Sequence, residues 1–134
     1  MKALIRVSLS LLGALLCGAS VACGVCIEDK IAATYDHGVV TQAGIQRHLV
    51  VFGDIDGAVA MNALLAKISA AAARVHGIDR GTVRTSASPP AFSFALDPAA
   101  RSPESAVADL QRRLRSRGAK LSVLRVMSGD AARN

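Results

Sequence analysis

Residues 91–110 read AFSFALDPAARSPESAVADL, and this stretch decides the fold because a strand, a turn and a helix start follow one another directly. Its large apolar side chains alternate with small ones, which is typical of a strand with one buried face: they are Phe92, Phe94 and Leu96. Ser102 can cap a helix, Pro103 suits the first helical position and Glu104 favours the positive end of the helix dipole. Apolar residues at helical spacing follow, and we expect this helix to end at Gly118: they are Val107, Leu110 and Leu114.

Working outward from this stretch, the same reasoning places four further elements. The apolar run 48–55 predicts a strand buried on both faces, and 58–75 carries one apolar stripe of a helix. Residues 82–87 alternate as an edge strand would, a Ser-Pro-Pro turn follows at 88–90, and 120–127 is the last strand. The order β-α-β-β-α-β predicts an α+β, ferredoxin-like sandwich over 48–127, with an antiparallel sheet, both helices on one face, and a polar tail at 128–134.

The first 22 residues have the pattern of a signal peptide. Lys2 and Arg6 precede the apolar run 7–16, and small residues stand at 20–22. The run is shorter than the roughly 20 residues that a membrane-spanning helix needs. We therefore expect an exported protein of the periplasm or envelope. Its membrane contact would be only through an uncleaved signal or through a lipid on Cys23. Val21-Ala22-Cys23 is similar to a lipoprotein cleavage site.

A Cys-x-x-Cys pair, Cys23 and Cys26, opens the expected mature chain. Residues 23–47 form an N-terminal helical segment in this interpretation, and we expect the Cys pair to cap the start of its helix. Apolar residues recur there every four positions: Ile27, Ile31, Tyr35 and Val39. Two thiolates at this spacing can bind one soft ion, and Cu(I) accepts two sulfur ligands whereas Zn(II) prefers four. The sequence therefore predicts a copper or zinc site at Cys23 and Cys26. Glu28 and Asp29 are either additional ligands or ordinary acids of a first helical turn.

Two alternatives to metal binding stay open. The first is an envelope structural or interaction module in which Cys23 is lipidated or paired with Cys26. The second is thiol–disulfide exchange, although no strand precedes Cys23 as it would in a thioredoxin-like unit. No enzyme signature is present. The chain has a net charge of +6, and its basic run at 112–117 is either a solvated helix face or a contact for anionic lipid or an acidic partner. Nucleic acid is not expected for an exported chain with one Tyr and three Phe.

Residues 48–127 resemble the heavy-metal-associated domain, the ferredoxin-like module of copper chaperones and metal-transport ATPases. The resemblance lies in the element order, in Phe94-Ala95-Leu96-Asp97-Pro98-Ala99, in Ser102-Pro103-Glu104 and in the Gly118 before the last strand. It implies a soft metal ion as ligand, and another envelope protein or a metal transporter as partner. The family binds its metal through a Met-x-Cys-x-x-Cys loop after the first strand. The corresponding residues 53–60 contain no Cys, so the pair at 23–26 is the only dithiol that could serve.

Overall fold

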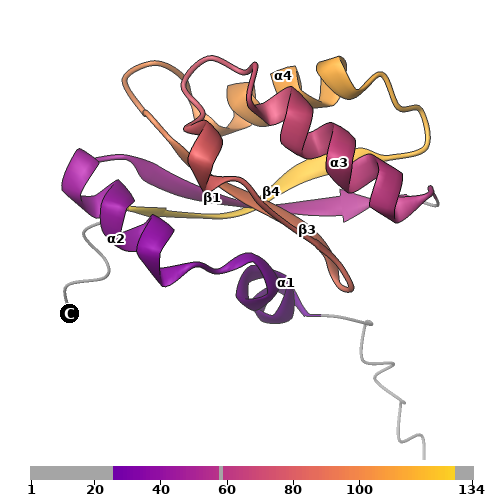
Figure 1. The fold of residues 1–134 in the computed structure, drawn as a ribbon, viewed down its shortest axis with the longest axis horizontal. Helices are drawn as coiled ribbons and strands as arrows, with labels where there is room; N and C mark the ends of the chain where they lie inside the picture. The colour runs from indigo at the N-terminus through magenta and orange to yellow at the C-terminus, as the bar shows by residue number, and fades with distance from the viewer. Residues whose placement is uncertain (1–25, 58, 129–134) are drawn as a thin grey trace, which may run out of the picture.

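The computed structural model describes residues 26–57 and 59–128 (Figure 1). The expected signal peptide, Cys23 and most of the polar tail lie outside these residues. None of the helices within the described ranges combines the length and the apolar character that a membrane span requires.

The chain is an α+β protein built around one four-stranded antiparallel sheet, and its topology is compatible with a ferredoxin-like fold. The strands lie in the order β2-β3-β1-β4, and every neighbouring pair is antiparallel. The strands are β1 (Leu49–Asp56), β2 (Arg84–Ala87), β3 (Pro90–Leu96) and β4 (Lys120–Ser128). The helices are α1 (Ile27–Thr34), α2 (His37–Gln46), α3 (Met61–Ala72) and α4 (Pro103–Leu114), with a short 3₁₀ turn at Arg80–Thr82.

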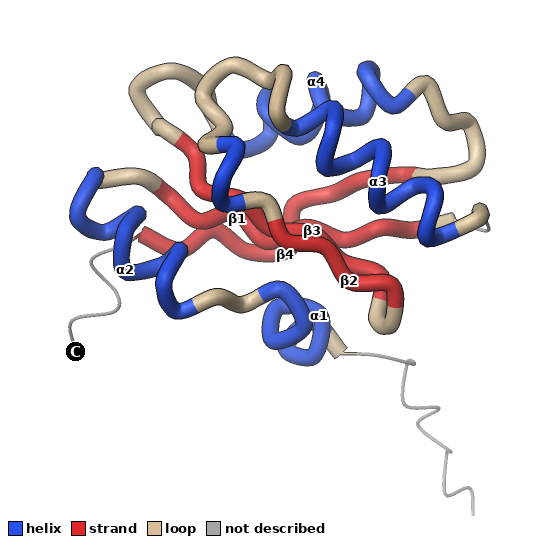
Figure 2. The backbone as a smooth tube through the Cα atoms, viewed as in Figure 1, coloured by secondary structure: helices blue, strands red, loops and turns tan. Residues whose placement is uncertain are grey.

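Two helical layers cover the two faces of this sheet (Figure 2). We call α3 and α4 the α3/α4 layer, and α1 and α2 the α1/α2 layer. The α3/α4 layer encloses the larger core, in which side chains of both helices meet alternate residues of the strands. This core includes Ile68, Ala72, Leu110, Val51, Phe92 and Phe94. The amphipathic stripes and the strand periodicity over 48–127 predicted these contacts, and the placement of both these helices on one face is confirmed.

The α1/α2 layer buries the other face of the sheet. Ile31, Val39, Val40 and Ala43 pack against Val50, Phe52 and Ala95 of the two central strands. The expected burial of β1 on both faces is therefore confirmed. The expectation of a single buried face for β3 is wrong, because Ser93 and Ala95 lie beneath α1 and α2 and are as inaccessible as Phe92 and Phe94.

The segment 27–47 is two helices rather than one. The chain leaves helical geometry at Tyr35 and Asp36, and the Asp36 side chain accepts a hydrogen bond from the Val39 amide, which begins α2. Ile31 and Val39 of the predicted stripe are buried, whereas Ile27 and Tyr35 are exposed. A one-face stripe through 27–39 is thus wrong, because the break reorients the second helix.

The boundaries of α4 also differ in part from expectation. Ser102 caps the helix by accepting from the Ser105 amide, and Pro103 is its first residue, as predicted. The helix ends at Leu114 instead of Gly118, because Arg115 adopts left-handed geometry with φ of 50°.

A candidate metal-binding segment at the start of helix α1

Cys26 stands at the N-terminus of α1 and is exposed. Its carbonyl oxygen accepts hydrogen bonds from the amides of Asp29 and Lys30, at 3.1 and 3.3 Å, so it begins the helix as predicted. Its thiol donates to the Asp29 carboxylate, with 3.3 Å between Sγ and Oδ2. Cys26 has no disulfide partner among residues 26–57 and 59–128. Cys23 lies outside the described residues, so the geometry of the pair stays a prediction.

Helix α1 is docked across the sheet by polar contacts with three strands. Glu28 near its start pairs with Arg125 of β4, and Lys30 pairs with Asp54 of β1. At its end, the Thr34 carbonyl oxygen accepts from Ser93 Oγ of β3 at 2.9 Å. An eight-residue helix is about 12 Å long, close to the roughly 10 Å that separates β4 from β3 across β1. The helix therefore crosses the strands, and Cys26 lies at the β4 side of the sheet.

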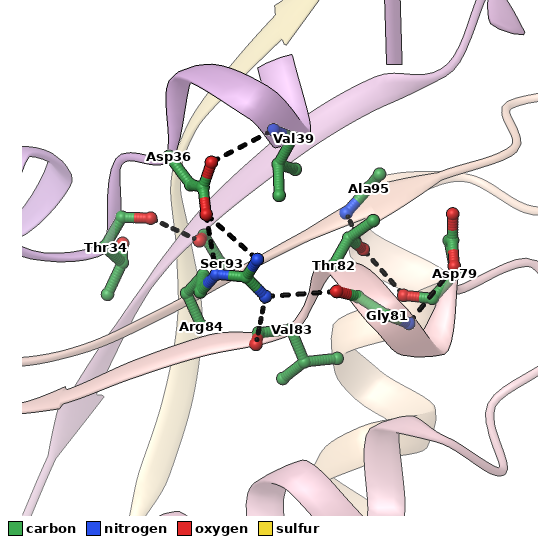
Figure 3. A network of polar contacts seen from close by, with 10 residues as sticks. All are labelled: Thr34, Asp36, Val39, Asp79, Gly81, Thr82, Val83, Arg84, Ser93 and Ala95. Carbon is green, nitrogen blue, oxygen red and sulfur yellow. Dashed lines mark hydrogen bonds and ion pairs between the residues drawn. The ribbon is translucent and has the colours of Figure 1, made fainter. Parts of the chain in front are cut away.

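The junction between α1 and α2 is tied to the opposite edge of the sheet (Figure 3). Asp36 pairs with Arg84 of β2, with 2.9 Å between Oδ2 and Nη2. Arg84 also donates from Nη1 to the carbonyl oxygens of Gly81 and Val83, which fixes the guanidinium against the chain that precedes β2. The Val39 amide and Arg84 together lower the pKa of the Asp36 carboxyl. Both ends of the α1 segment are thus anchored to sheet edges.

The two acids beside Cys26 have different partners. Glu28 accepts two hydrogen bonds from the Arg125 guanidinium, which lowers the pKa of Glu28 and raises that of Arg125. Glu28 is therefore engaged in docking the helix. Asp29 makes its side-chain contact with the Cys26 thiol and is the acid that a metal at this thiol would meet first.

The loop that carries metal ligands in the heavy-metal-associated family is closely packed here. Gly57 has φ of +135°, and a Cβ at this position would lie 1.9 Å from the Gly118 carbonyl oxygen. Asp54, within the expected loop 53–60, belongs instead to strand β1 and pairs with Lys30 of α1. Within the described part of the chain, no three His, Cys, Asp or Glu side chains gather as a metal site. A second sulfur ligand from Cys23 stays a prediction, because Cys23 lies outside the described residues.

Sequence reasoning identified Cys26 and its place at a helix start but missed the docking of α1. The sequence feature that could have predicted this docking is the presence of polar residues on the sheet face opposite the main core. Asp54, Ser93 and Arg125 are polar residues within strands, and each has a partner in α1.

Comparison of the chain with protein-family models, with curated proteins and with solved structures gave no match. The assignment of a function therefore depends on the residues and the geometry described above.

Proposed function

We propose that this protein is an exported, heavy-metal-associated-like domain that binds one soft metal ion, Cu(I) in preference to Zn(II), through the thiols of Cys23 and Cys26. One observation carries the proposal: Cys26 is exposed at the start of a helix that is held across the sheet. Cys26 thus stands beside a structured domain rather than on a free projecting helix. The α+β topology, compatible with a ferredoxin-like fold, supports the resemblance from which the expectation of a metal came.

The donor set favours Cu(I). Two sulfur ligands suffice for Cu(I), whereas Zn(II) requires about four ligands. Among the described residues, Asp29 is the one acid in contact with the Cys26 thiol, so a zinc ion would still lack a ligand.

The exposure of Cys26 supports a carrier role rather than permanent storage. A partner that presents its own thiols can reach an ion held at the edge of a domain and take it by ligand exchange. Such a partner would be another envelope protein or a metal transporter. The site differs from the family pattern in its location, because its sulfurs precede α1 on one face of the sheet whereas the family loop follows β1.

Titration of the reduced full chain with Cu(I) against a competing chelator tests this function. We expect one ion per chain, and loss of that ion when both Cys23→Ser and Cys26→Ser are introduced. Cys17→Ser is the matched control, because it removes the third thiol of the chain and should leave the stoichiometry unchanged. Asp29→Asn should weaken zinc binding more than copper binding. Equal copper binding by the double variant would contradict the proposal.

The intact mass of the protein isolated from its own envelope separates the alternatives. A diacylglyceryl-sized increase on Cys23 would leave one thiol and would support a lipid-anchored interaction module instead. Reduction of insulin by the reduced protein, faster than by a simple dithiol, would favour thiol–disulfide exchange.

A further inference from the structure

The outer surface of the α3/α4 layer carries a basic groove between its two helices. The groove has a volume of about 500 Å³ and contains four cationic side chains over a small apolar floor. The cations are Lys67, Arg74, Arg113 and Arg115, and the floor consists of Ala70, Ala71 and Leu114. No carboxylate lines it. A gathering of positive charge without counter-charges attracts anions.

The four cations differ in how strongly they are already paired. Asp109 of α4 pairs with Arg101, Arg112 and Arg113, and the Arg101 hydrogen bond together with the other two arginines lowers the pKa of Asp109 to about 2. Arg113 is therefore partly neutralised. Lys67, Arg74 and Arg115 form no ion pair within residues 26–57 and 59–128. Three cations thus remain available to a ligand.

The rest of this layer is positive as well. Residues 61–76 contain Lys67 and Arg74 and no acid. Residues 101–120 contain six basic side chains against Glu104 and Asp109. The α1/α2 layer has the opposite balance, because residues 26–47 hold Lys30 and Arg47 against Glu28, Asp29 and Asp36. The molecule therefore presents one basic and one weakly acidic helical face.

We propose that the α3/α4 layer docks on an anionic lipid surface, with headgroup phosphates seated in the groove between Lys67, Arg74 and Arg115. Charge complementarity selects this occupant. Lys67 lies in α3, whereas Arg74 and Arg115 follow the ends of α3 and α4, and all three are exposed around the groove. A continuous charged surface can therefore reach all of them at once. The large apolar side chains of these helices face the sheet, so binding is electrostatic and needs no insertion. Nucleic acid is a weaker match, since the three Phe side chains are buried and cannot stack on bases.

This docking is independent of the proposed metal site. Cys26 is the N-cap residue of α1. Helices α1 and α2 cover the face of the sheet opposite to α3 and α4 (Figure 1). Membrane contact through α3 and α4 would leave that layer facing away from the lipid. Failure of one proposal therefore leaves the other intact.

Sedimentation of the full chain with vesicles tests the docking. Vesicles of phosphatidylglycerol and phosphatidylcholine should bind the protein more tightly than vesicles of phosphatidylcholine alone, and 0.5 M NaCl should abolish the difference because it screens the charges. Apolar partitioning of the expected signal peptide should be the same for both kinds of vesicle, so it does not contribute to the difference. Each Lys or Arg near an anionic surface contributes about fivefold in partition coefficient, so Arg74→Gln should weaken binding by about that factor.

Arg47→Gln is the matched control, because it removes one positive charge from the α1/α2 layer. It should change the partition coefficient by less than about twofold, since Arg47 lies on the opposite face of the sheet. Lys67→Gln, also at an exposed position, repeats the test at a second cation of the groove. Circular dichroism of each variant verifies that it is folded.

Equal binding by the Arg74 and Arg47 variants would overturn the proposal, as would equal binding to the two kinds of vesicle. A competition with inorganic phosphate at constant ionic strength distinguishes a lipid surface from a free anion. Saturable displacement by millimolar phosphate would identify a site for small phosphate-bearing molecules and would also overturn the membrane proposal.

Discussion

The α3/α4 layer contacts the sheet through large apolar side chains, whereas the α1/α2 layer contacts the other face through a smaller apolar patch and several polar bonds. On the first face, Ile68 and Leu110 have no exposed surface. On the second, Lys30, Asp36 and Glu28 each pair with a strand residue at the margin of the patch. Exposed ion pairs contribute well under 1 kcal/mol each, while a fully buried large aliphatic side chain contributes about 1.5–3 kcal/mol. We infer that the layer bearing Cys26 is the less firmly held of the two.

The same substitution in each layer tests this difference and should have the largest effect. Ile68→Ala in α3 should lower the free energy of unfolding by about 3–5 kcal/mol, because it leaves a cavity in the main core. Ile31→Ala in α1, where the residue is 7% exposed, should cost only about 2 kcal/mol. Urea denaturation followed by far-ultraviolet circular dichroism measures both values.

Hydrogen exchange in the same variants shows whether the layers unfold together. Ile31→Ala should accelerate exchange of α1 amides while α3 and α4 amides keep their protection, since a weakly held layer opens locally. Equal losses of stability, with exchange accelerated throughout, would show that the two layers form one cooperative unit.

The contrast between the layers also explains which parts of the fold could be predicted. Strand and helix periodicities over 48–127 identified every element of the sheet and of the α3/α4 layer, because those side chains meet a common core. The docking of the α1/α2 layer was not predicted, because its contacts join residues far apart in sequence. Glu28 and Arg125 are 97 positions apart, and Ser93 and Thr34, whose carbonyl oxygen accepts from Ser93 Oγ, are 59 positions apart. The periodicity of apolar residues within one segment does not indicate such long-range pairs.

For the candidate site, the sequence pattern predicted the helix start at Cys26 but not where that helix packs. Cys26 was expected at the start of a helix because the predicted helical segment follows the Cys-x-x-Cys pair directly. The different partners of these two acids depend on where α1 lies, which the sequence did not reveal. The role of Cys23 stays a prediction for the same reason.

Removal of the N-cap in each layer should have an intermediate effect. Ser102→Ala in α4 removes one hydrogen bond to the Ser105 amide and should cost about 1 kcal/mol. Asp36→Ala in α2 removes the bond to the Val39 amide and the pair with Arg84 together, so its cost should be about 1–2 kcal/mol. Thermal unfolding of both variants compares them. Arg84→Gln should cost less in the Asp36→Ala background than in the unmodified protein, whereas an additive loss would show that the two side chains act separately.

Acidification should produce the smallest effect and should reach both layers. Glu28 and Asp36 in the α1/α2 layer and Asp109 in α4 all have lowered pKa values, in each case through hydrogen bonds that favour the charged carboxylate. A carboxyl whose pKa is lower in the folded state contributes stability above its unfolded pKa and loses it as the pH falls through the folded value. For Asp109 that window runs from the model-compound value of 3.8 down to about 2.

Asp109→Asn isolates the contribution of the α3/α4 layer to this pH dependence. Two of its three arginine partners are well exposed and screened, so its contribution at pH 7 should be of order 1 kcal/mol. The variant should therefore be less stable than the unmodified protein at pH 7 and nearly equal to it at pH 2. Urea midpoints measured at pH 7, 4 and 2 follow this convergence. A difference in stability that persists at pH 2 would mean that Asp109 acts through packing rather than charge. The α3/α4 layer would then be held to the sheet almost wholly by apolar contacts.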